Sequence, residues 1–224
     1  NNREEYYSAI LSGCIYIERM FLNVFMLCFS LQAALAAEWD CSATSGVFTL
    51  SVDCMVSSQV EVTGILSITG VVNASGVLPR VIGGGSNRLF YVGSGGKLIL
   101  ETLTLTEGNV AENNCYNFTN VPWHNQNKAF GGAIYVNTDS EFIGIKVKIM
   151  GNKACSGGGL FSLRGTVQLN DTFIGDNTAR VAGGGLLVRL GSFKMIGGNV
   201  SNNYVIDTRD DDAVDLGGGG AFFW

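Results

Sequence analysis

The sequence contains little proline, little histidine and few charges. Of its 224 residues, 2 are proline, 1 is histidine and 15% are charged, while 46% are hydrophobic. Because a disordered chain combines high net charge with little apolar material, this composition predicts a packed core. The formal net charge is −5, and no run of Lys or Arg occurs. A basic surface for nucleic acid or for an anionic bilayer is therefore excluded, and we expect no nucleic-acid partner.

The motifs of common catalytic and metal sites are also missing. No Cys-x-x-Cys pair or Cys/His cluster has the spacing of a zinc site. The only histidine, His124, stands beside Trp123 without the nucleophile and orienting acid of a hydrolytic triad. Runs of glycine precede expected strands and lack the Lys-Ser/Thr of a phosphate-binding loop. The sequence therefore predicts no catalytic residue and no organic cofactor.

Glycine, in contrast, is abundant, and the chain is repetitive. The 31 glycines amount to about twice the average share of about 7%. Without proline, they fit tight turns between short strands. Three thirteen-residue lines share one pattern of residue types: SEFIGIKVKIMGN (140–152), GTVQLNDTFIGDN (165–177) and GSFKMIGGNVSNN (191–203). Their third column holds Phe142, Val167 and Phe193, and their tenth holds Ile149, Ile174 and Val200.

Two further lines extend the repeat, GKLILETLTLTEG (96–108) and, with one residue of slip, SQVEVTGILSITG (58–70). A second apolar element precedes most lines, as in GGAIYV (131–136). A fixed period of about 25 residues is typical of solenoids, and the alternation of apolar residues is typical of strands. We therefore predict an all-β fold over 57–224, a right-handed, pectin-lyase-like parallel β-helix of about five to six coils. Equivalent residues of successive coils stack in this fold.

Two columns of the repeat have a structural interpretation. Asn152, Asn177 and Asn203 end the three lines. We expect each to adopt the left-handed backbone conformation and to donate its amide to the next asparagine in a ladder. Gly108 stands in this column and is expected to fill only the first role. Tight corners that leave no room for a Cβ are predicted at Gly132, Gly158 and Gly184.

The first 37 residues are predicted to be a leader. The apolar run Phe21–Leu31 is followed by the small residues at 34–37, which predicts a helical secretory signal that begins at Met20. Residues 1–19 are then readthrough. The alternative is a membrane anchor formed by residues 20–37. We expect residues 38–56 to form an N-terminal cap and the mature chain to be secreted or exposed at the cell surface.

Export would make disulfides and glycans available to the chain. Four cysteines remain after the leader, and we expect the pairs Cys41–Cys54 and Cys115–Cys155, with free buried thiols as the alternative. Asn-x-Ser/Thr sequons, which accept glycans in a eukaryotic source, lie at Asn73, Asn117, Asn170 and Asn199.

Two insertions interrupt the repeat, at 109–130 and at 204–216. The second is acidic, and its carboxylates at Asp207, Asp210, Asp212 and Asp215 are interpreted either as a solvated loop or as a Ca²⁺ site. A third alternative uses Asp210, Asp211 and Asp212 with Arg209 in polysaccharide cleavage, but the motifs of β-helix hydrolases are missing. Calcium is thus the only cofactor that the sequence suggests.

The elements GGAI (131–134), IMGN (149–152), FIGDN (173–177) and VSNN (200–203) resemble the GGA[I/L/V] and FxxN repeats of the polymorphic outer-membrane proteins of chlamydiae. In place of the family's phenylalanine stand Ile149, Ile174 and Val200, and the family's C-terminal membrane barrel is absent. The resemblance implies a surface-exposed or secreted β-helix with a role in adhesion.

We therefore expect an adhesin-like structural or binding module whose ligand is a cell-surface group or a carbohydrate. Membrane contact is expected only through the leader or through regions beyond Trp224, because the last line opens a new coil and predicts a fragment. The alternative is a carbohydrate-active enzyme of the pectin-lyase-like class. Such an enzyme would align carboxylates and a base in one lateral groove, whereas a binding module would not.

Overall fold

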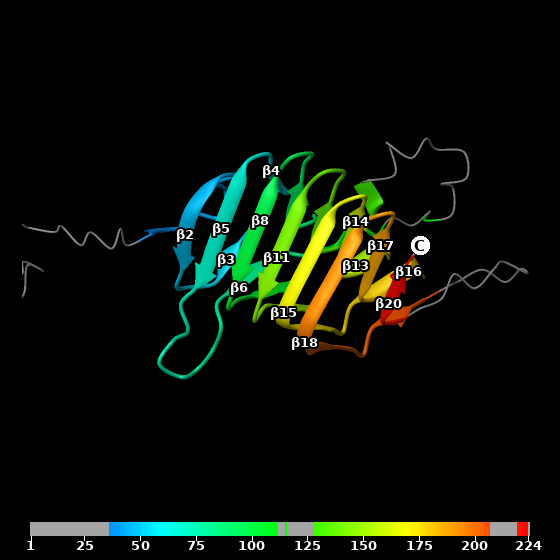
Figure 1. Cartoon of the computed structure of the whole chain (residues 1–224). Coiled ribbons are helices and arrows are strands. Elements are labelled where there is room, and N and C mark those ends of the chain that lie inside the picture. The colour runs from blue at the N-terminus through cyan, green and yellow to red at the C-terminus, as the bar shows by residue number, and fades with distance from the viewer. Residues whose placement is uncertain (1–35, 112–114, 116–127, 207–218, 224) are drawn as a thin grey trace, which may run out of the picture. The chain divides into compact units, whose positions relative to one another are not determined.

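The computed structural model describes residues 36–111, 115, 128–206 and 219–223 (Figure 1). Residues 1–35 of the predicted leader, which spans 1–37, lie outside these ranges, and its last residue, Ala37, begins a strand. The compact unit Ala37–Trp224 is built from short strands. Its described part contains no α-helix, and every strand pair in it is parallel. No helix there has the length and apolarity needed to cross a bilayer. An all-β, parallel fold is thus confirmed.

The first sheet consists of two rows of strands. One row lies side by side in Figure 1 and contains β1 (Ala37–Glu38), β2 (Gly46–Leu50), β5 (Ile65–Gly70), β8 (Lys97–Glu101), β11 (Glu141–Ile145), β15 (Thr166–Gly175) and β18 (Ser192–Ser201). The other row contains β3 (Cys54–Met55), β6 (Arg80–Ile82), β9 (Thr104–Thr106) and β12 (Lys148–Met150). The ten-residue strand β15 joins the rows, because its first half pairs with β11 and its second half with β12.

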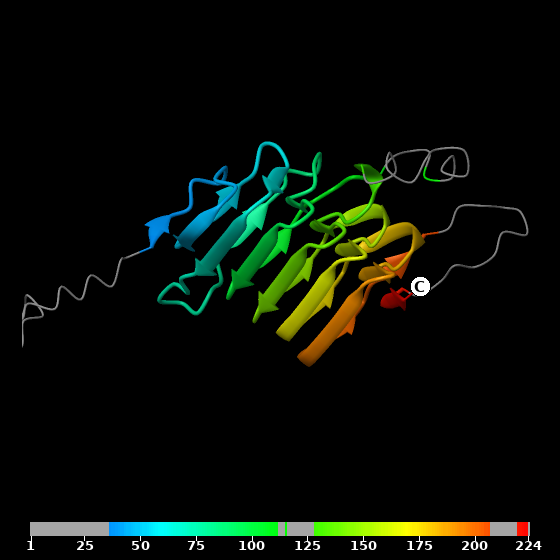
Figure 2. The same ribbon diagram turned by 45° about the horizontal axis from the view of Figure 1, so that its top comes forward.

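A second sheet completes each winding, and a third, smaller sheet is added in the later windings. One contains β4 (Val60–Val62), β7 (Phe90–Val92), β10 (Ile134–Val136), β14 (Leu160–Leu163), β17 (Leu186–Arg189) and β20 (Ala221–Phe223). The other contains β13 (Lys153–Ser156), β16 (Thr178–Ala182) and β19 (Tyr204–Val205). The chain passes through the rows in turn and then returns to the first row one strand further on, a path that can be followed in Figure 2. We call one such circuit a winding.

The predicted columns are correct in the repeat lines from 96 onward. Phe142 pairs with Leu98 on one side and Val167 on the other, and Val167 pairs with Phe193. Phe142 and Val167 are fully buried, while Phe193, in the last described winding, is partly buried. Apolar side chains that stack on their own equivalents therefore form one continuous interior, as strand alternation and burial require.

The predicted line 58–70 is wrong in register by six residues. Leu66 pairs with Leu98, whereas Val60 pairs with Phe90 of the second element. Residues 58–70 thus contain β4, a corner at Thr63–Gly64 and the first part of the next winding. The error has a physical cause: six is even, so the alternation of apolar residues runs on across the corner without a break.

The left-handed positions lie one residue before the predicted ones. Positive φ angles occur at Gly151 (69°), Asp176 (56°) and Asn202 (54°), each directly before an asparagine of the column, and at Glu107 before Gly108. The asparagines themselves are buried, since the preceding residue makes the corner and the asparagine side chain then points into the molecule. The prediction that these asparagines and Gly108 are left-handed is therefore wrong.

The glycine corners are confirmed and divide into two functions. In the pairs that end at Gly132, Gly158 and Gly184, the first glycine has positive φ, as at Gly157 (61°). The second lies against the main chain of the next winding. A Cβ on Gly158 would clash with the carbonyl oxygens of Gly184 and Thr178. The windings can approach this closely only because the column contains no side chain.

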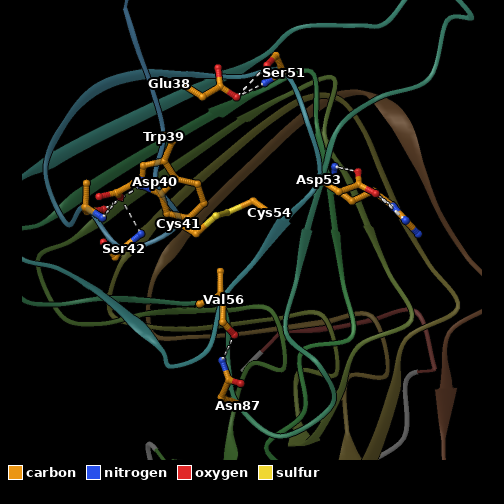
Figure 3. Close-up of a disulfide and its surroundings, with 12 residues drawn as sticks. Glu38, Trp39, Asp40, Cys41, Ser42, Ser51, Asp53, Cys54, Val56 and Asn87 are labelled. Atoms are coloured by element: carbon orange, nitrogen blue, oxygen red, sulfur yellow. Dashed lines mark hydrogen bonds and ion pairs between the residues drawn. A yellow bond between two sulfur atoms is a disulfide. The ribbon is translucent and has the colours of Figure 1, made fainter.

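The predicted cap, residues 38–56, contains strands of the first sheet. The side chain of Trp39 is buried, with 2% of its surface exposed, and it stacks on Phe90 with ring centroids 5.7 Å apart. Its indole Nε1 donates to the carbonyl oxygen of Ala43 at 3.1 Å. Figure 3 shows Trp39 beside the disulfide of Cys41 and Cys54. A large apolar side chain and a covalent crosslink thus cover the interior at this end.

Candidate functional site

Both expected disulfides are present. Cys41 is bonded to Cys54, with a Cα–Cα distance of 5.8 Å, and Cys115 is bonded to Cys155, with a distance of 5.4 Å. The second bond closes a stretch of 40 residues. It fastens the first insertion to strand β13, next to the outer face of β10 and β14.

The asparagine ladder is also present, and its bonds are buried. Nδ2 of Asn152 donates to Oδ1 of Asn177 at 2.9 Å, and Nδ2 of Asn177 donates to Oδ1 of Asn203 at 3.0 Å. Each Oδ1 also accepts the main-chain N–H of the asparagine one winding earlier. Gly108 continues the ladder, because its N–H donates to Oδ1 of Asn152 at 2.9 Å. These residues have a structural role.

Several predicted site residues cannot be placed. Asp207, Asp210, Asp212 and Asp215 of the expected calcium site lie outside the described residues, as do Asn117 and His124. Within 36–111, 115, 128–206 and 219–223, no group of three His, Cys, Asp or Glu side chains is arranged to bind a metal ion. The calcium site stays a prediction.

An aromatic row on the outer face of β7, β10 and β14 escaped the sequence analysis. The ring centroids of Tyr91 and Tyr135 are 5.3 Å apart, as are those of Tyr135 and Phe161, and Phe130 stacks on Phe161 at 4.7 Å. Tyr91, Tyr135 and Phe161 lie in the second elements, such as LFYV, where alternation directs them outward. The first insertion returns over this row at Ala129 and Phe130, which are buried against it.

Arg88 fixes the end of that insertion. Its guanidinium donates to the carbonyl oxygens of Phe130 at 2.6 Å and Gly131 at 3.0 Å, and it lies 5.1 Å from the ring centre of Tyr135. Burial lowers the pKa of Arg88 to about 10 and raises the pKa of Tyr135 to about 12. Both groups keep their ordinary charge at neutral pH. The cluster holds the chain in place before the Gly131 corner and offers no open surface.

An open groove of about 630 Å³ lies at the corner between the second sheet and the first. It receives side chains from four successive windings: Ile65, Lys97, Asp139, Glu141, Arg164 and Thr166. Lys97, Glu141 and Thr166 come together because they are register partners in β8, β11 and β15. The corner at Asp139 has a φ of 56° and is supported by Ser140, whose buried hydroxyl donates to the carbonyl oxygen of Asn137 at 2.6 Å.

The groove contains both signs of charge, but the two carboxylates differ. Nζ of Lys97 is 2.7 Å from Oε2 of Glu141, and Gln168 donates to the other oxygen, Oε1, at 3.0 Å. Each carboxylate oxygen of Glu141 therefore already has one partner. Among the described residues, no side-chain partner contacts the carboxylate of Asp139 or the guanidinium of Arg164. These two exposed groups are left to accept and to donate hydrogen bonds to a ligand.

Sequence reasoning missed this groove for a simple reason. Asp139 and Arg164 are isolated charges in turns 25 residues apart, and no motif joins them. Each of these residues stands directly before the first residue of a repeat line. Only when the lines are aligned do the two turns come together.

Comparisons of this chain with family models, curated proteins and solved structures found no match in any of the three. The resemblance to the chlamydial repeats therefore stays a prediction from short motifs.

Proposed function

We propose that this chain is a right-handed parallel β-helix that is exported and acts as an adhesin-like binding module, with a carbohydrate as its ligand. The observation that carries the proposal is the lateral groove, in which two neighbouring windings present the unengaged carboxylate of Asp139, the unengaged guanidinium of Arg164 and the hydroxyl of Thr166 side by side. Sugars offer many hydroxyl groups, which charged donors and acceptors of this kind bind.

The architecture supports the proposal in two ways. Three sheets of parallel strands in which each strand pairs with its equivalent one winding away are the pattern of a parallel β-helix, and parallel crossovers are almost always right-handed. The two disulfides favour an oxidising compartment, since cytosolic proteins rarely keep them. The chlamydial resemblance adds the expectation of a surface-exposed adhesin.

Binding is favoured over catalysis by the state of Glu141. A glycoside hydrolase needs two carboxylates in separate acid and base roles. In the groove, Glu141 has both oxygens bound, by Lys97 and Gln168, so only Asp139 remains for chemistry. We keep the pectin-lyase-like enzyme as the second candidate, because a lyase could use a single base.

Binding to immobilised polygalacturonate, alginate, xylan and cellulose oligosaccharides tests the proposal. Arg164→Ala and Asp139→Asn should each weaken binding about tenfold, the equivalent of one charged hydrogen bond. Lys148→Ala and Asp176→Asn are matched controls: the first removes another exposed cation, and the second changes another aspartate with a φ of 56°.

The controls should bind like the wild-type chain. Equal losses in the controls and the groove variants, or no binding to any polysaccharide, would refute the groove as the site. Release of unsaturated or reducing ends from any polysaccharide would establish the enzyme instead.

A further inference from the structure

The loop between β5 and β6 is the most exposed described connection of the first sheet. In Figures 1 and 2 it projects past the ends of these strands. All seven residues from 71 to 77 are exposed. Three of them are valines, and Val71, Val72 and Val77 expose 48%, 43% and 56% of their surfaces. A loop of this kind should be polar, so apolar exposure here requires an explanation.

Asn73 organises this loop through its own side chain. Its Oδ1 accepts the main-chain N–H groups of Ser75 at 3.0 Å and Val77 at 2.9 Å. Its carbonyl oxygen accepts the N–H of Gly76 at 2.9 Å. Both partners of the carboxamide are N–H donors, so the oxygen must face the turn and the nitrogen must face away from it.

Among the hydrogen bonds of the described residues, none involves Nδ2 of Asn73. This nitrogen belongs to the sequon Asn73-Ala74-Ser75. The bond from Ser75 to Oδ1 brings the first and third residues of the sequon together on the outside of the molecule. The atom to which an N-linked glycan is attached is thus exposed, oriented and without a competing bond.

The other described sequons differ in this respect. The hydroxyl of Thr172, third residue of the Asn170 sequon, is fully buried and donates to the carbonyl oxygen of Gly144 at 3.2 Å. Asn199 lies in strand β18, where its Nδ2 already donates to the hydroxyl of Ser201 at 3.3 Å. Both asparagines lie within strands that pair with their neighbours, whereas Asn73 lies in an open turn.

We propose that Asn73 carries an N-linked glycan and that this glycan covers the exposed valines of the loop. In the attachment step, Nδ2 forms a bond to C1 of the first sugar of an oligosaccharide linked to a lipid pyrophosphate. The bond from C1 to the pyrophosphate breaks, the lipid pyrophosphate leaves with the electron pair, and Nδ2 loses one proton to a base of the transferase. The polar glycan then lies over Val71, Val72 and Val77, which removes their apolar surface from water.

The site rests on the proposed export, so the test separates the two. The full chain is expressed in a glycosylating eukaryotic host behind that host's own secretory leader, which makes delivery independent of residues 1–35. Peptide mass spectrometry after enzymatic glycan removal then reports the state of Asn73. The Cys41–Cys54 crosslink reports passage through the oxidising compartment. Secretion of the chain by its own residues 20–37 is measured separately and tests export alone.

The wild-type chain and two variants define the result for Asn73. The wild-type chain and Ser75→Thr should carry the glycan, and Ser75→Ala should lose it. Ser75→Ala keeps the bond from the main chain of Ser75 to Oδ1, so the turn remains and loss of the glycan reports the sequon rather than misfolding. An unmodified Asn73 in secreted chain with the Cys41–Cys54 crosslink formed would overturn the proposal.

Binding of an apolar fluorescent dye tests the covering function. Ser75→Ala should bind more dye than the glycosylated chain, and Ser75→Ala combined with Val72→Thr and Val77→Thr should bring the signal back down. A dye signal that is the same with and without the glycan would overturn the claim that the glycan covers these valines.

Discussion

The asparagine ladder allows a quantitative prediction at its middle member. The side chain of Asn177 is fully buried and takes part in four hydrogen bonds. Its Oδ1 accepts from the main-chain N–H of Asn152 at 3.0 Å and from Nδ2 of Asn152 at 2.9 Å. Its Nδ2 donates to the carbonyl oxygen of Ile149 at 2.8 Å and to Oδ1 of Asn203 at 3.0 Å. Asn177→Ala removes all four bonds at once.

The expected loss follows from the energy of a buried hydrogen bond. At about 1 kcal/mol net for each bond, Asn177→Ala should lower the free energy of unfolding by about 4 kcal/mol. In this variant the main-chain N–H of Asn152 loses its acceptor while it remains buried. Because a buried donor without a partner is costly, the loss in unfolding free energy should not fall below this value. Because whole domains are stable by only about 5–15 kcal/mol, the change should be large and easily measured.

Urea unfolding followed by circular dichroism measures this change. Asn170→Ala is the matched control, because Asn170 lies in the same winding but is exposed, and its loss should stay within about 0.5 kcal/mol. A loss below about 1 kcal/mol in Asn177→Ala, with an unchanged slope against urea, would refute the reasoning. It would mean that water or neighbouring groups replace the ladder bonds.

Two further predictions concern the corners of the fold. Gly158→Ala should lower the free energy of unfolding, measured by urea titration, by at least about 2 kcal/mol, because the added Cβ would meet rigid main chain. The control Gly76→Ala has a φ of 76° but open space around the added Cβ, and it should lower the free energy of unfolding by only about 1 kcal/mol. Similar losses in the two variants would contradict the contact argument. Hydrogen bonds from the side chain of Arg80 hold the pKa of Asp53 below its ordinary value of 3.8. A carboxyl with a lowered folded-state pKa stabilises the fold above its unfolded-state pKa and loses that effect as the pH falls through the lowered value. Arg80→Ala should therefore be less stable than the wild-type chain at pH 7, and the difference should vanish in acid; a difference that does not change with pH would be the contrary result.

The columns of the interior were predictable because stacking imposes the same demand on each winding. Phe142 and Val167 occupy equivalent places, so both must be apolar although their letters differ. The ladder was predictable for the same reason, since an amide can pair with its own copy. The corners were harder: an asparagine signals a corner nearby but does not tell which residue makes it, and Asp176 proved to be the left-handed one.

The register of 58–70 and the candidate groove required information that alternation does not contain. A period of two residues is unchanged by any even shift, so Val60 and Leu66 fit equally well in one column. The groove depends on which turns lie above one another, and therefore on single residues such as Asp139 and Arg164 whose chemistry has no local motif. The outer aromatic row was visible as a pattern, with Tyr91 and Tyr135 at the same place in their lines. The pattern did not show that Ala129 and Phe130 of the first insertion cover this aromatic row.

The pairing of every strand with its equivalent one winding away also has a mechanical consequence. A force that pulls two neighbouring windings apart along the stacking direction acts at the same time on the main-chain hydrogen bonds of three strand pairs. These pairs are β8 with β11, β9 with β12 and β7 with β10. A force that peels the chain from one end meets the same bonds singly. The molecule should therefore resist tension along its stack far better than unzipping from an end.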